Sequence, residues 1–276
     1  MQIIDGRKIR DEILEDLKKE VEELSFMPIF CDILVGSDSV SASYVRIKAK
    51  TAESIGIKFR TAEFDENITT EELIAEIENL NKVPYMCGII VQLPLPYHID
   101  RERVLNAIDP NLDVDCLGEI ANNKFYNGED VMGYPTALSC MHILDNLNLD
   151  LKEKNILVLG QGKLVGLPVS YLLKERSLNV NVVNSKTENT EELIKNADII
   201  ISAIGQGGYI KGDMIKKDVI IVDAGTSEDN GSVVGDVDFP SVSLYASHIT
   251  PTPGGVGPIT VAMLLRNVLQ VAKNKK

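Results

Sequence analysis

The sequence predicts an α/β protein whose two α/β domains flank a cleft, the second domain being Rossmann-like. Three observations predict this class. Short apolar runs alternate with longer segments of helical periodicity along the chain. A glycine-rich turn, Gly160 to Gly166, directly follows one apolar run and precedes a helical pattern. The length of 276 residues suits about two domains of roughly 150 residues each.

The first half of the chain alternates helical and strand patterns. Helical spacing of apolar residues, or the absence of Pro and Gly, predicts helices at 9–24, 41–55 and 70–80. Buried or alternating apolar patterns predict strands at 29–35, 57–64 and 87–91. Pro94 and Pro96 end regular structure after the third strand. This order favours a mostly parallel sheet covered by helices.

The middle of the chain changes character. The stretch from Ile99 to Gly133 is rich in Asp, Asn, Gly and Pro, and we expect loops there. A linking helix is expected over 136–147, and a second series of strands over 156–159, 179–183, 197–205 and 219–225. We expect the helix that follows Pro258 to pack back on the first domain. The expected domains are therefore 1–136 with 257–276, and 137–256.

Charge and composition exclude several classes of protein. Lys and Arg number 28 against 41 Asp and Glu, so the net charge is −13, which argues against nucleic-acid binding. No apolar run reaches the roughly 18–20 residues that span a bilayer, and we expect no signal peptide and no membrane association. The 4 cysteines and 3 histidines form no C-x-x-C and no H-x-x-x-H pattern. We therefore expect no metal site, and reduced thiols in a cytoplasmic protein.

The glycine turn is the first candidate ligand site. Gly160, Gly162 and Gly166 stand between a predicted strand and a predicted helix. Glycines let the backbone approach a pyrophosphate, and the free N–H groups of a helix N-terminus attract anions. The spacing departs from G-x-G-x-x-G because Val165 occupies the third glycine position. By itself, the turn could equally be an ordinary connection from strand to helix.

The end of the next strand favours NADP over NAD. A typical NAD site carries Asp or Glu there to hold the ribose 2′-hydroxyl. This chain has Asn184, Ser185, Lys186 and Thr187, with no carboxylate to repel a 2′-phosphate. Ser185, Lys186 and Thr187 could bind that phosphate. The alternative is a polar turn in which Lys186 is merely solvated.

A candidate reactive lysine lies in the N-terminal half. Tyr44 and Lys48 are four residues apart and Ser41 precedes Tyr44 by three, so all three share one face of a helix. A lysine beside an aromatic ring and partly out of water has a lowered pKa and can exchange protons near neutrality. By pattern alone, a surface lysine with an ordinary tyrosine contact is the simpler explanation.

Five blocks of the sequence resemble the bifunctional methylenetetrahydrofolate dehydrogenase/methenyltetrahydrofolate cyclohydrolase family. They run from Val35 to Lys50, Gly88 to Pro96, Asp113 to Asp115, Gly160 to Pro168 and Thr250 to Thr260, and together they cover essentially the whole chain. The Val-Gln-Leu-Pro-Leu-Pro and Pro-Gly-Gly-Val-Gly-Pro blocks are highly specific. The resemblance implies oxidation of methylenetetrahydrofolate by NADP to methenyltetrahydrofolate, followed by hydrolysis to formyltetrahydrofolate. It also implies a cytoplasmic homodimer that serves one-carbon metabolism and purine biosynthesis.

The resemblance implies a role for each matching residue. Lys48 is the catalytic lysine of the cyclohydrolase step, Gln92 hydrogen-bonds it, Tyr44 stacks on the folate and Asp115 holds the polar edge of the pteridine. The implied folate-binding residues are Ser41, Tyr44, Val91, Leu93, Pro94, Asp115, Pro253, Gly254 and Gly255. The expected NADP-binding residues are Gly160, Gln161, Gly162, Leu164, Val165, Gly166, Ser185, Lys186, Thr187, Ala203, Gly205, Thr226, Gly257 and Thr260.

The chain departs from the family pattern at several places. The usual Lys-Asp-Val-Asp-Gly is Leu112 to Cys116, the usual Gly-Arg-Ser is Gly160-Gln161-Gly162, and Asn184 replaces a histidine. Loss of the arginine weakens the case for NADP, although Lys163 or Lys186 could compensate. Three alternatives stay open: a dehydrogenase with weak cyclohydrolase activity, an NADP-binding regulatory module without catalysis, and a different NADP oxidoreductase acting, for example, on a cyclic hydroxy acid.

Overall fold

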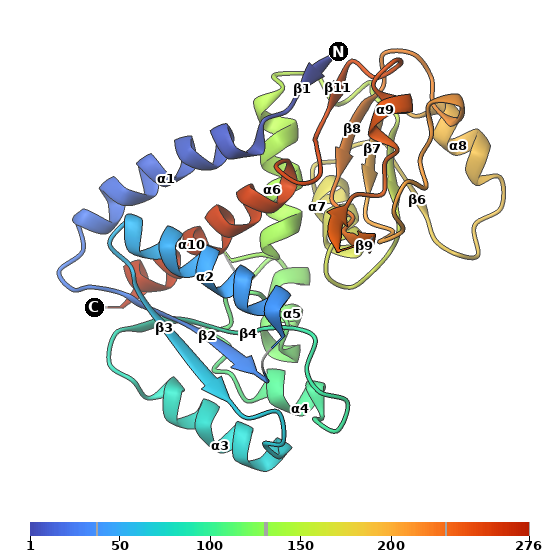
Figure 1. Ribbon diagram of the computed structural model, residues 1–276. Helices are drawn as coiled ribbons and strands as arrows, with labels where there is room; N and C mark the ends of the chain where they lie inside the picture. Colours follow the sequence, from blue (N-terminus) through green and yellow to red (C-terminus); the bar gives the residue numbers. More distant parts are fainter. Residues whose placement is uncertain (37, 130–131, 230, 276) are drawn as a thin grey trace. The chain divides into compact units, whose positions relative to one another are not determined.

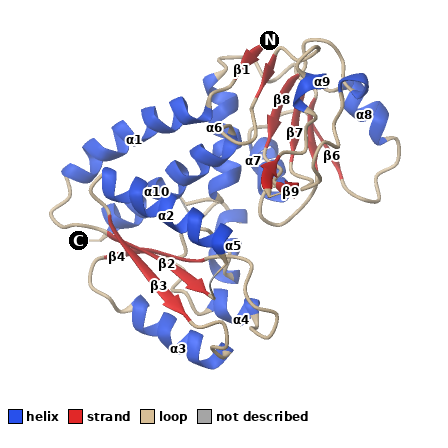
Figure 2. Ribbon diagram, viewed as in Figure 1, coloured by secondary structure: helices blue, strands red, loops and turns tan. Residues whose placement is uncertain are grey.

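The computed structural model describes residues 1–36, 38–129, 132–229 and 231–275, which form two compact units (Figure 1). Unit 1 comprises Met1–Asp11 and Tyr134–Thr260, and unit 2 comprises Glu12–Gly133 and Val261–Lys276. Each unit contains a parallel β-sheet with helices (Figure 2), which confirms the predicted α/β class. Residues 1–11 lie with unit 1, and the division into a folate-binding and an NADP-binding domain stays a prediction.

Unit 2 is built on a three-stranded parallel sheet in the order β3-β2-β4. The strands are β2 (Ile29–Val35), β3 (Lys58–Phe64) and β4 (Met86–Val91). The side chains of β2 and β4 are almost all buried, as expected for parallel strands covered on both faces. The main helices are α1 (Gly6–Glu22), α2 (Ser39–Ser54), α3 (Thr70–Asn81) and the C-terminal α10 (Val256–Asn274). Both α1 and α10 cross the boundary between the units.

Side-chain caps determine where two of these helices begin. The Asp38 carboxylate accepts the Ser41 N–H at 2.7 Å at the start of α2. At the start of α3, Thr69 Oγ1 accepts the Glu72 N–H at 3.2 Å, and Glu72 accepts the Thr69 N–H at 2.9 Å. Each cap satisfies N–H groups that have no partner within the helix.

The loop prediction for Ile99 to Gly133 was wrong in part. This stretch contains α4 (Arg101–Asn106) and α5 (Glu119–Tyr126). The Asp100 carboxylate caps α4 by accepting the Arg103 N–H at 3.1 Å. Val104 and Leu105 of α4 are buried, as are Ala121 and Phe125 of α5. Helices this short are stabilised by burial of one face rather than by intrinsic propensity, so sequence periodicity gives little signal.

Unit 1 contains a six-stranded parallel sheet in the order β1-β11-β8-β7-β5-β6. The strands are β1 (Gln2–Ile3), β5 (Ile156–Leu159), β6 (Val180–Val183), β7 (Ile199–Ser202), β8 (Ile220–Asp223) and β11 (His248–Ile249). From β5 the chain adds β6 on one side and β7 on the other. In such sheets, ligands bind at the carboxyl ends of the strands where the order reverses.

The remaining elements of unit 1 are short apart from two helices. They are α6 (Pro135–Asn146), α7 (Gly166–Glu175), α8 (Thr190–Asn196), the 3-10 turn η1 (Gly212–Met214), the antiparallel pair β9 (Ser227–Asp229) and β10 (Ser232–Val234), and α9 (Phe239–Val242). A hydrophobic core that includes Leu157, Ile200 and Ile221 of the sheet also contains Ile194 of α8 and Val242 of α9.

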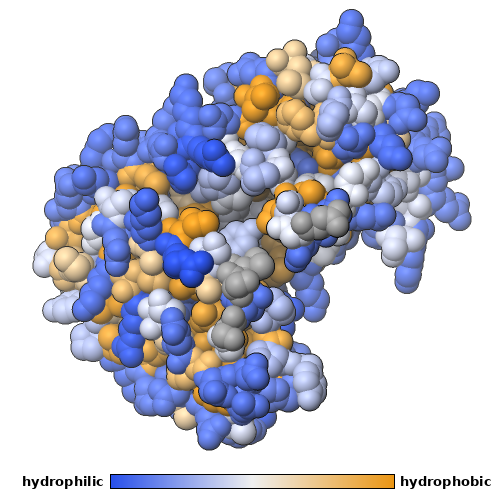
Figure 3. Space-filling view, viewed as in Figure 1, coloured by the Kyte–Doolittle hydropathy of each residue, from blue (hydrophilic) through white to orange (hydrophobic). Residues whose placement is uncertain are grey.

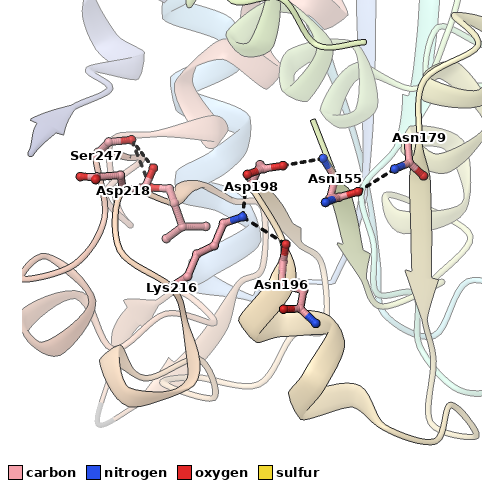
Figure 4. Close-up of polar contacts among 8 residues, drawn as sticks. Asn155, Asn179, Asn196, Asp198, Lys216, Asp218 and Ser247 are labelled. Atoms are coloured by element: carbon pink, nitrogen blue, oxygen red, sulfur yellow. Dashed lines mark hydrogen bonds and ion pairs between the residues drawn. The ribbon is translucent and has the colours of Figure 1, made fainter. Parts of the chain in front are cut away.

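A polar network joins the residues that precede the strands of unit 1 (Figure 4). Asp198 accepts the Asn155 N–H at 2.7 Å and pairs with Lys216 at 2.6 Å, while Asn179 donates to Asn155 at 2.6 Å. Burial raises the pKa of Asp198, but the hydrogen bonds and charge of its partners outweigh burial and leave that pKa below its usual value. The network lies at the amino ends of the strands, opposite the edge where a ligand is expected, so we interpret it as structural.

The surface in view is mostly polar. Figure 3 shows hydrophilic residues over much of the face in view, with hydrophobic residues scattered among them. Each helix that the structure describes is too short or too polar to cross a membrane.

Candidate active site

Lys48 is a buried lysine of α2, with a side chain only 10% exposed. Its Nζ donates a hydrogen bond to Gln92 Oε1 at 2.8 Å and lies 2.6 Å from Asp32 Oδ2. The alternative of an ordinary surface lysine therefore does not fit. Burial of an amine is costly unless polar partners surround it, and here two elements supply them.

The sheet of unit 2 positions both partners. Asp32 lies on the central strand β2, and Gln92 follows the last residue of β4. The Gln92 N–H donates to the Ile33 carbonyl at 2.8 Å, which extends the pairing of β4 with β2 by one residue. The Gln92 amide nitrogen donates to the Leu93 carbonyl at 3.3 Å, so the amide oxygen is the atom that faces Lys48.

The loop that carries Asp115 is ordered by its neighbour Asp113. The Ile89 N–H of β4 donates to the Leu112 carbonyl at 2.8 Å, which holds the loop along the strand. Asp113 is buried and accepts the Gly118 N–H at 2.7 Å. Burial raises the pKa of Asp113 to about 6, against the opposing effect of several backbone N–H groups. Asp113 therefore shapes the loop that presents Asp115.

Asp115 is partly exposed at the end of this loop. Burial raises its pKa to about 7, the Lys48 charge lowers it, and the charges of Asp113 and Asp32 raise it further. The carboxyl group of Asp115 thus belongs to the same electrostatic cluster as Lys48. A group with this pKa can gain or lose a proton near neutrality.

The other predicted folate-binding residues of unit 2 differ in exposure. Ser41 is buried on the first turn of α2, and Val91 is buried at the end of β4. Tyr44 is 43% exposed, which leaves ring surface available to stack on a flat ligand. Leu93 is half-buried and Pro94 is exposed.

Pro253, Gly254 and Gly255 lie in unit 1, where the structure supplies a packing reason for the glycines. The Gly6 N–H donates to the Gly254 carbonyl at 3.0 Å. A Cβ on Gly6 would lie 1.7 Å from the Gly255 carbonyl oxygen, so the two backbones touch. The folate contact expected of these three residues stays a prediction.

The glycine turn of unit 1 has the shape of a phosphate cradle. Gly160 has a φ of 91°, and a Cβ there would lie 2.3 Å from the Ala203 carbonyl oxygen. A Cβ on Gly166 would lie 1.9 Å from the Gly160 carbonyl oxygen. A Cβ on Gly162 would meet no heavy atom of the described residues within 4 Å, so its backbone faces open space. These residues fit the pyrophosphate of a dinucleotide.

The start of α7 completes this cradle. Val165 is the N-cap residue of α7 and makes no side-chain hydrogen bond to the first turn. In the first turn, the Leu167 N–H donates to the Gly162 carbonyl at 3.1 Å and Pro168 has no N–H, so the Gly166 N–H is the donor of that turn suited to an anion. Gln161 instead supports the turn, because its amide nitrogen donates to the Gly160 carbonyl at 2.9 Å and to Ser170 Oγ at 3.0 Å. Leu164 is exposed beside it.

The turn after β6 presents the residues predicted to select NADP. The Asn184 N–H donates to Thr187 Oγ1 at 3.0 Å, and the Lys186 N–H donates to Asn184 Oδ1 at 2.9 Å. These bonds order the backbone, while the side chains of Ser185 and Lys186 are exposed. The arrangement fits a 2′-phosphate approached by a hydroxyl and an ammonium group.

Two buried acids, Asp223 and Asp236, organise the loops of the remaining cofactor candidates. Asp236 accepts the Ser202 hydroxyl at 2.7 Å and the N–H groups of Ile204 and Gln206 at 2.8 Å each, which fixes the segment containing Ala203 and Gly205. Burial raises the pKa of Asp223 to about 7, and the Asp236 charge raises it further. The sequence analysis did not predict that Asp223 and Asp236 order these loops. The signal in the sequence is the glycines next to them, Gly225 and Gly235.

Close packing explains why glycine occupies positions 225 and 235, next to Thr226 and Asp236. A Cβ on Gly225 would lie 2.1 Å from the Asp236 carboxylate, and one on Gly235 would lie 2.0 Å from Asp223 Oδ2. Thr226 follows Gly225 and is exposed. At the start of α10, Gly257 is exposed, and Thr260 Oγ1 contacts Thr136 Oγ1 at 3.5 Å.

Sequence reasoning also missed Asp32. Its signal is a single acid within the apolar run Ile29–Val35, a position where a charge needs a buried partner. No motif connects Asp32 to Lys48, which follows 16 positions later on a different element.

Comparison with known proteins decides the family. Residues 4–115 match the family model "Tetrahydrofolate dehydrogenase/cyclohydrolase, catalytic domain". Residues 134–276 match "Tetrahydrofolate dehydrogenase/cyclohydrolase, NAD(P)-binding domain". The chain belongs to the tetrahydrofolate dehydrogenase/cyclohydrolase family. This finding confirms the family predicted from the five sequence blocks.

Full-length relatives of this family are similar throughout the chain. The "Bifunctional protein FolD" of Nitratiruptor sp. is 41% identical over 280 residues, which covers 100% of this chain and 99% of the relative. The crystal structure of the bifunctional FolD enzyme of Campylobacter jejuni superposes with a TM-score of 0.94 at 38% identity and covers 100% of both chains. A Trypanosoma brucei FolD structure complexed with NADP cofactor and inhibitor superposes with a TM-score of 0.91 at 36% sequence identity. The match covers 99% of this chain and 97% of that one.

Proposed function

We propose that this chain oxidises 5,10-methylenetetrahydrofolate to 5,10-methenyltetrahydrofolate with NADP and then hydrolyses the product to 10-formyltetrahydrofolate. The proposal rests above all on Lys48, buried in the catalytic-domain half and held by Gln92 at 2.8 Å. The family models for a catalytic and an NAD(P)-binding domain support it, as do the bifunctional relatives. NADP, when bound, accepts the hydride in the first reaction.

The chain itself supplies binding and orientation for the dehydrogenase step. The Tyr44 ring stacks on the pteridine, and the Asp115 carboxylate accepts hydrogen bonds from its aminopyrimidine edge. The cradle at Gly160, Gly162 and Gly166 binds the pyrophosphate, and Lys186 binds the 2′-phosphate. Alignment of the two reacting rings is the main catalytic contribution of the protein to this step.

The cyclohydrolase step needs proton transfer. Water attacks the cationic methenyl carbon, the bond from that carbon to N5 breaks, and one proton is released overall. Lys48 Nζ is the group placed to handle that proton, because Gln92 and Asp32 hold it in one position. The family resemblance also supports a cytoplasmic homodimer, with folate binding by 1–136 and 257–276 and NADP binding by 137–256.

A paired assay on the wild type and Lys48→Met tests the proposal. Methylenetetrahydrofolate is supplied with NADP or NAD and methenyl formation is followed by absorbance; decay of supplied methenyltetrahydrofolate is followed separately, above its spontaneous rate. We expect the wild type to catalyse both reactions, and Lys48→Met to lose at least about 100-fold in hydrolysis. The variant is expected to keep its affinity for NADP, because the cofactor cradle lies in unit 1.

A double variant controls for burial of an unpaired charge. Lys48→Met leaves Asp32 without its cation, and an unpaired buried charge destabilises a protein by about 3–5 kcal/mol. Lys48→Met/Asp32→Asn removes that charge and should still lack hydrolysis. Binding of NADP by a wild type that turns over neither folate would reject the proposal in favour of a regulatory module.

A further inference from the structure

Asp32 is the most unusual residue near the active site. Its side chain is 0% exposed on the central strand of unit 2, and Oδ2 lies 2.6 Å from Lys48 Nζ. Neither Oδ1 nor Oδ2 has a hydrogen-bond partner among the residues that the structure describes, so Oδ2 contacts Lys48 as an ion pair. The strand is otherwise apolar. Burial of a carboxylate costs free energy unless a cation compensates its charge. Lys48 is the cation that contacts Asp32, so we interpret Asp32 through its effect on Lys48.

The geometry at Nζ indicates what Asp32 does. A lysine ammonium has three N–H donors. One donates to Gln92 Oε1 at 2.8 Å, and Asp32 Oδ2 lies 2.6 Å from Nζ as an ion pair without hydrogen-bond geometry. Gln92 follows β4 and Asp32 lies on β2, so the sheet fixes both partners, and donor capacity of Nζ remains for a water molecule or for substrate. The two fixed partners thus aim the amine, and the charged partner also stabilises its protonated form.

We propose that Asp32 is a positioning residue for the cyclohydrolase step. Asp32 fixes Lys48 Nζ and sets the pH at which Lys48 exchanges its proton. The inference rests on the proposed role of Lys48. Because Asp32 is fully enclosed, it acts through Lys48 and does not touch folate.

The other groups around Lys48 do not replace this function. Asp115 acts on Lys48 through its charge, but it is partly exposed and makes no hydrogen bond or ion pair with Lys48 among the described residues. Tyr44, one helical turn earlier on α2, is exposed. The residues in register with Asp32 on the neighbouring strands are Thr61 and Ile90, both uncharged. Asp32 is therefore the buried anion that directly contacts the amine.

The test is the pH dependence of methenyltetrahydrofolate hydrolysis in the wild type and Asp32→Asn. The amide keeps the size of the side chain but removes its charge. An opposite charge at contact distance stabilises the protonated amine by about 1–3 pH units. We expect the limb of the kcat profile that depends on Lys48 to move to lower pH by at least one unit. We expect KM for methenyltetrahydrofolate to change less than about twofold.

A matched control separates this role from damage to the strand. Cys31 precedes Asp32 on β2, is also buried and points to the opposite face of the sheet. Cys31→Ala should lower thermal stability without moving the pH limb. Should Asp32→Asn fold poorly, Asp32→Ser provides a second uncharged variant with the same expected direction, and Asp32→Glu, which restores the charge, should return the limb toward its wild-type position.

The outcomes separate the two proposals. A wild type that does not hydrolyse methenyltetrahydrofolate refutes the function itself. A wild type that hydrolyses it, with Asp32→Asn and Asp32→Ser lowering kcat equally at every pH and leaving the limb in place, refutes the role of Asp32 alone. A shifted limb that Asp32→Glu reverses supports the role.

Discussion

Lys186 is the residue on which the choice between NADP and NAD depends most directly. It is exposed in the turn after β6, and that turn has no acid between Asn184 and Thr187. We expect Lys186→Asp to raise KM for NADP by about tenfold or more, which corresponds to about 1.4 kcal/mol, because a carboxylate would repel the 2′-phosphate. KM for NAD should change less than about threefold. Steady-state kinetics with both cofactors measures the difference.

Lys195→Asp provides the control for the prediction on Lys186. Lys195 is an exposed lysine of α8 in the same unit, so the substitution changes the net charge equally at a position outside the turn. It should leave both KM values near those of the wild type. An equal rise in KM for NADP and NAD in Lys186→Asp would exclude recognition of the 2′-phosphate by this lysine.

Cys116 shows the physical meaning of one departure from the family pattern. The family places glycine there, and the backbone of Cys116 has a φ of 59°, in the left-handed region that glycine adopts most easily. The thiol is buried. A cysteine therefore holds the left-handed backbone conformation in the loop that presents Asp115.

The candidate site was predictable from sequence only where a motif carried it. Lys48, Gln92 and Asp115 come from blocks with specific family patterns, and the structure groups them in unit 2. Asp32, Asp223 and Asp236 have no such pattern. Their roles arise from contacts between segments far apart in the chain, which local sequence does not encode.

Among the secondary-structure elements, the glycine turn before α7 offers a sharp test of cofactor binding. We expect Gly162→Ala to keep the fold, because the added methyl group meets no heavy atom of the described residues within 4 Å. The same methyl group would occupy the space into which a pyrophosphate must come, so the Kd for NADP should rise about tenfold or more. Cofactor titration and thermal unfolding measure the two effects.

Gly166→Ala is the contrasting variant for this turn. Its added Cβ would lie 1.9 Å from the Gly160 carbonyl oxygen, so the turn itself must shift and the melting temperature should fall along with affinity. If Gly162→Ala bound NADP as tightly as the wild type, the turn would not be the pyrophosphate site.

The accuracy of the predicted elements followed their length and burial. The strands predicted at 29–35 and 156–159 have those bounds in the structure, because an apolar run, interrupted by Asp32 in the first case, ends at glycine in each. The short helices α4 and α5 were missed, since they depend on tertiary burial. So were β1 and β11, two-residue strands that pair residues 2 and 3 with 248 and 249. Such pairing becomes visible only in the folded chain.

For the whole molecule, buried acids of both units determine how stability depends on pH. The pKa values of Asp113, Asp115 and Asp223 are raised to about 6, 7 and 7, mainly by burial, and burial also raises the pKa of Asp32. Between about pH 4 and pH 7 the folded chain thus binds more protons than the unfolded chain. The free energy of unfolding must fall as pH rises through this window.

Other acids act in the opposite direction at lower pH. The pKa of Asp198 is lowered, mainly by Lys216 and the Asn155 N–H acting against burial, and Thr69 lowers that of Glu72 through backbone and side-chain hydrogen bonds. Their contribution to stability is present above about pH 4 and is lost as the pH falls through their folded pKa values. The two sets together predict a stability maximum near pH 4.

Thermal unfolding at constant ionic strength from pH 3 to pH 8 tests this maximum. We expect the melting temperature to be highest near pH 4, to be lower by several degrees at pH 8, and to fall again at pH 3. Repulsion within a chain of net charge −13 also lowers stability at pH 8. Added NaCl screens this repulsion between exposed charges but does not change the desolvation of buried carboxylates. A decline from pH 5 to pH 8 that persists in 0.5 M NaCl, roughly a 4 Å Debye length, would therefore identify the buried acids as its cause. A melting temperature that is constant or rises toward pH 8 would contradict their role.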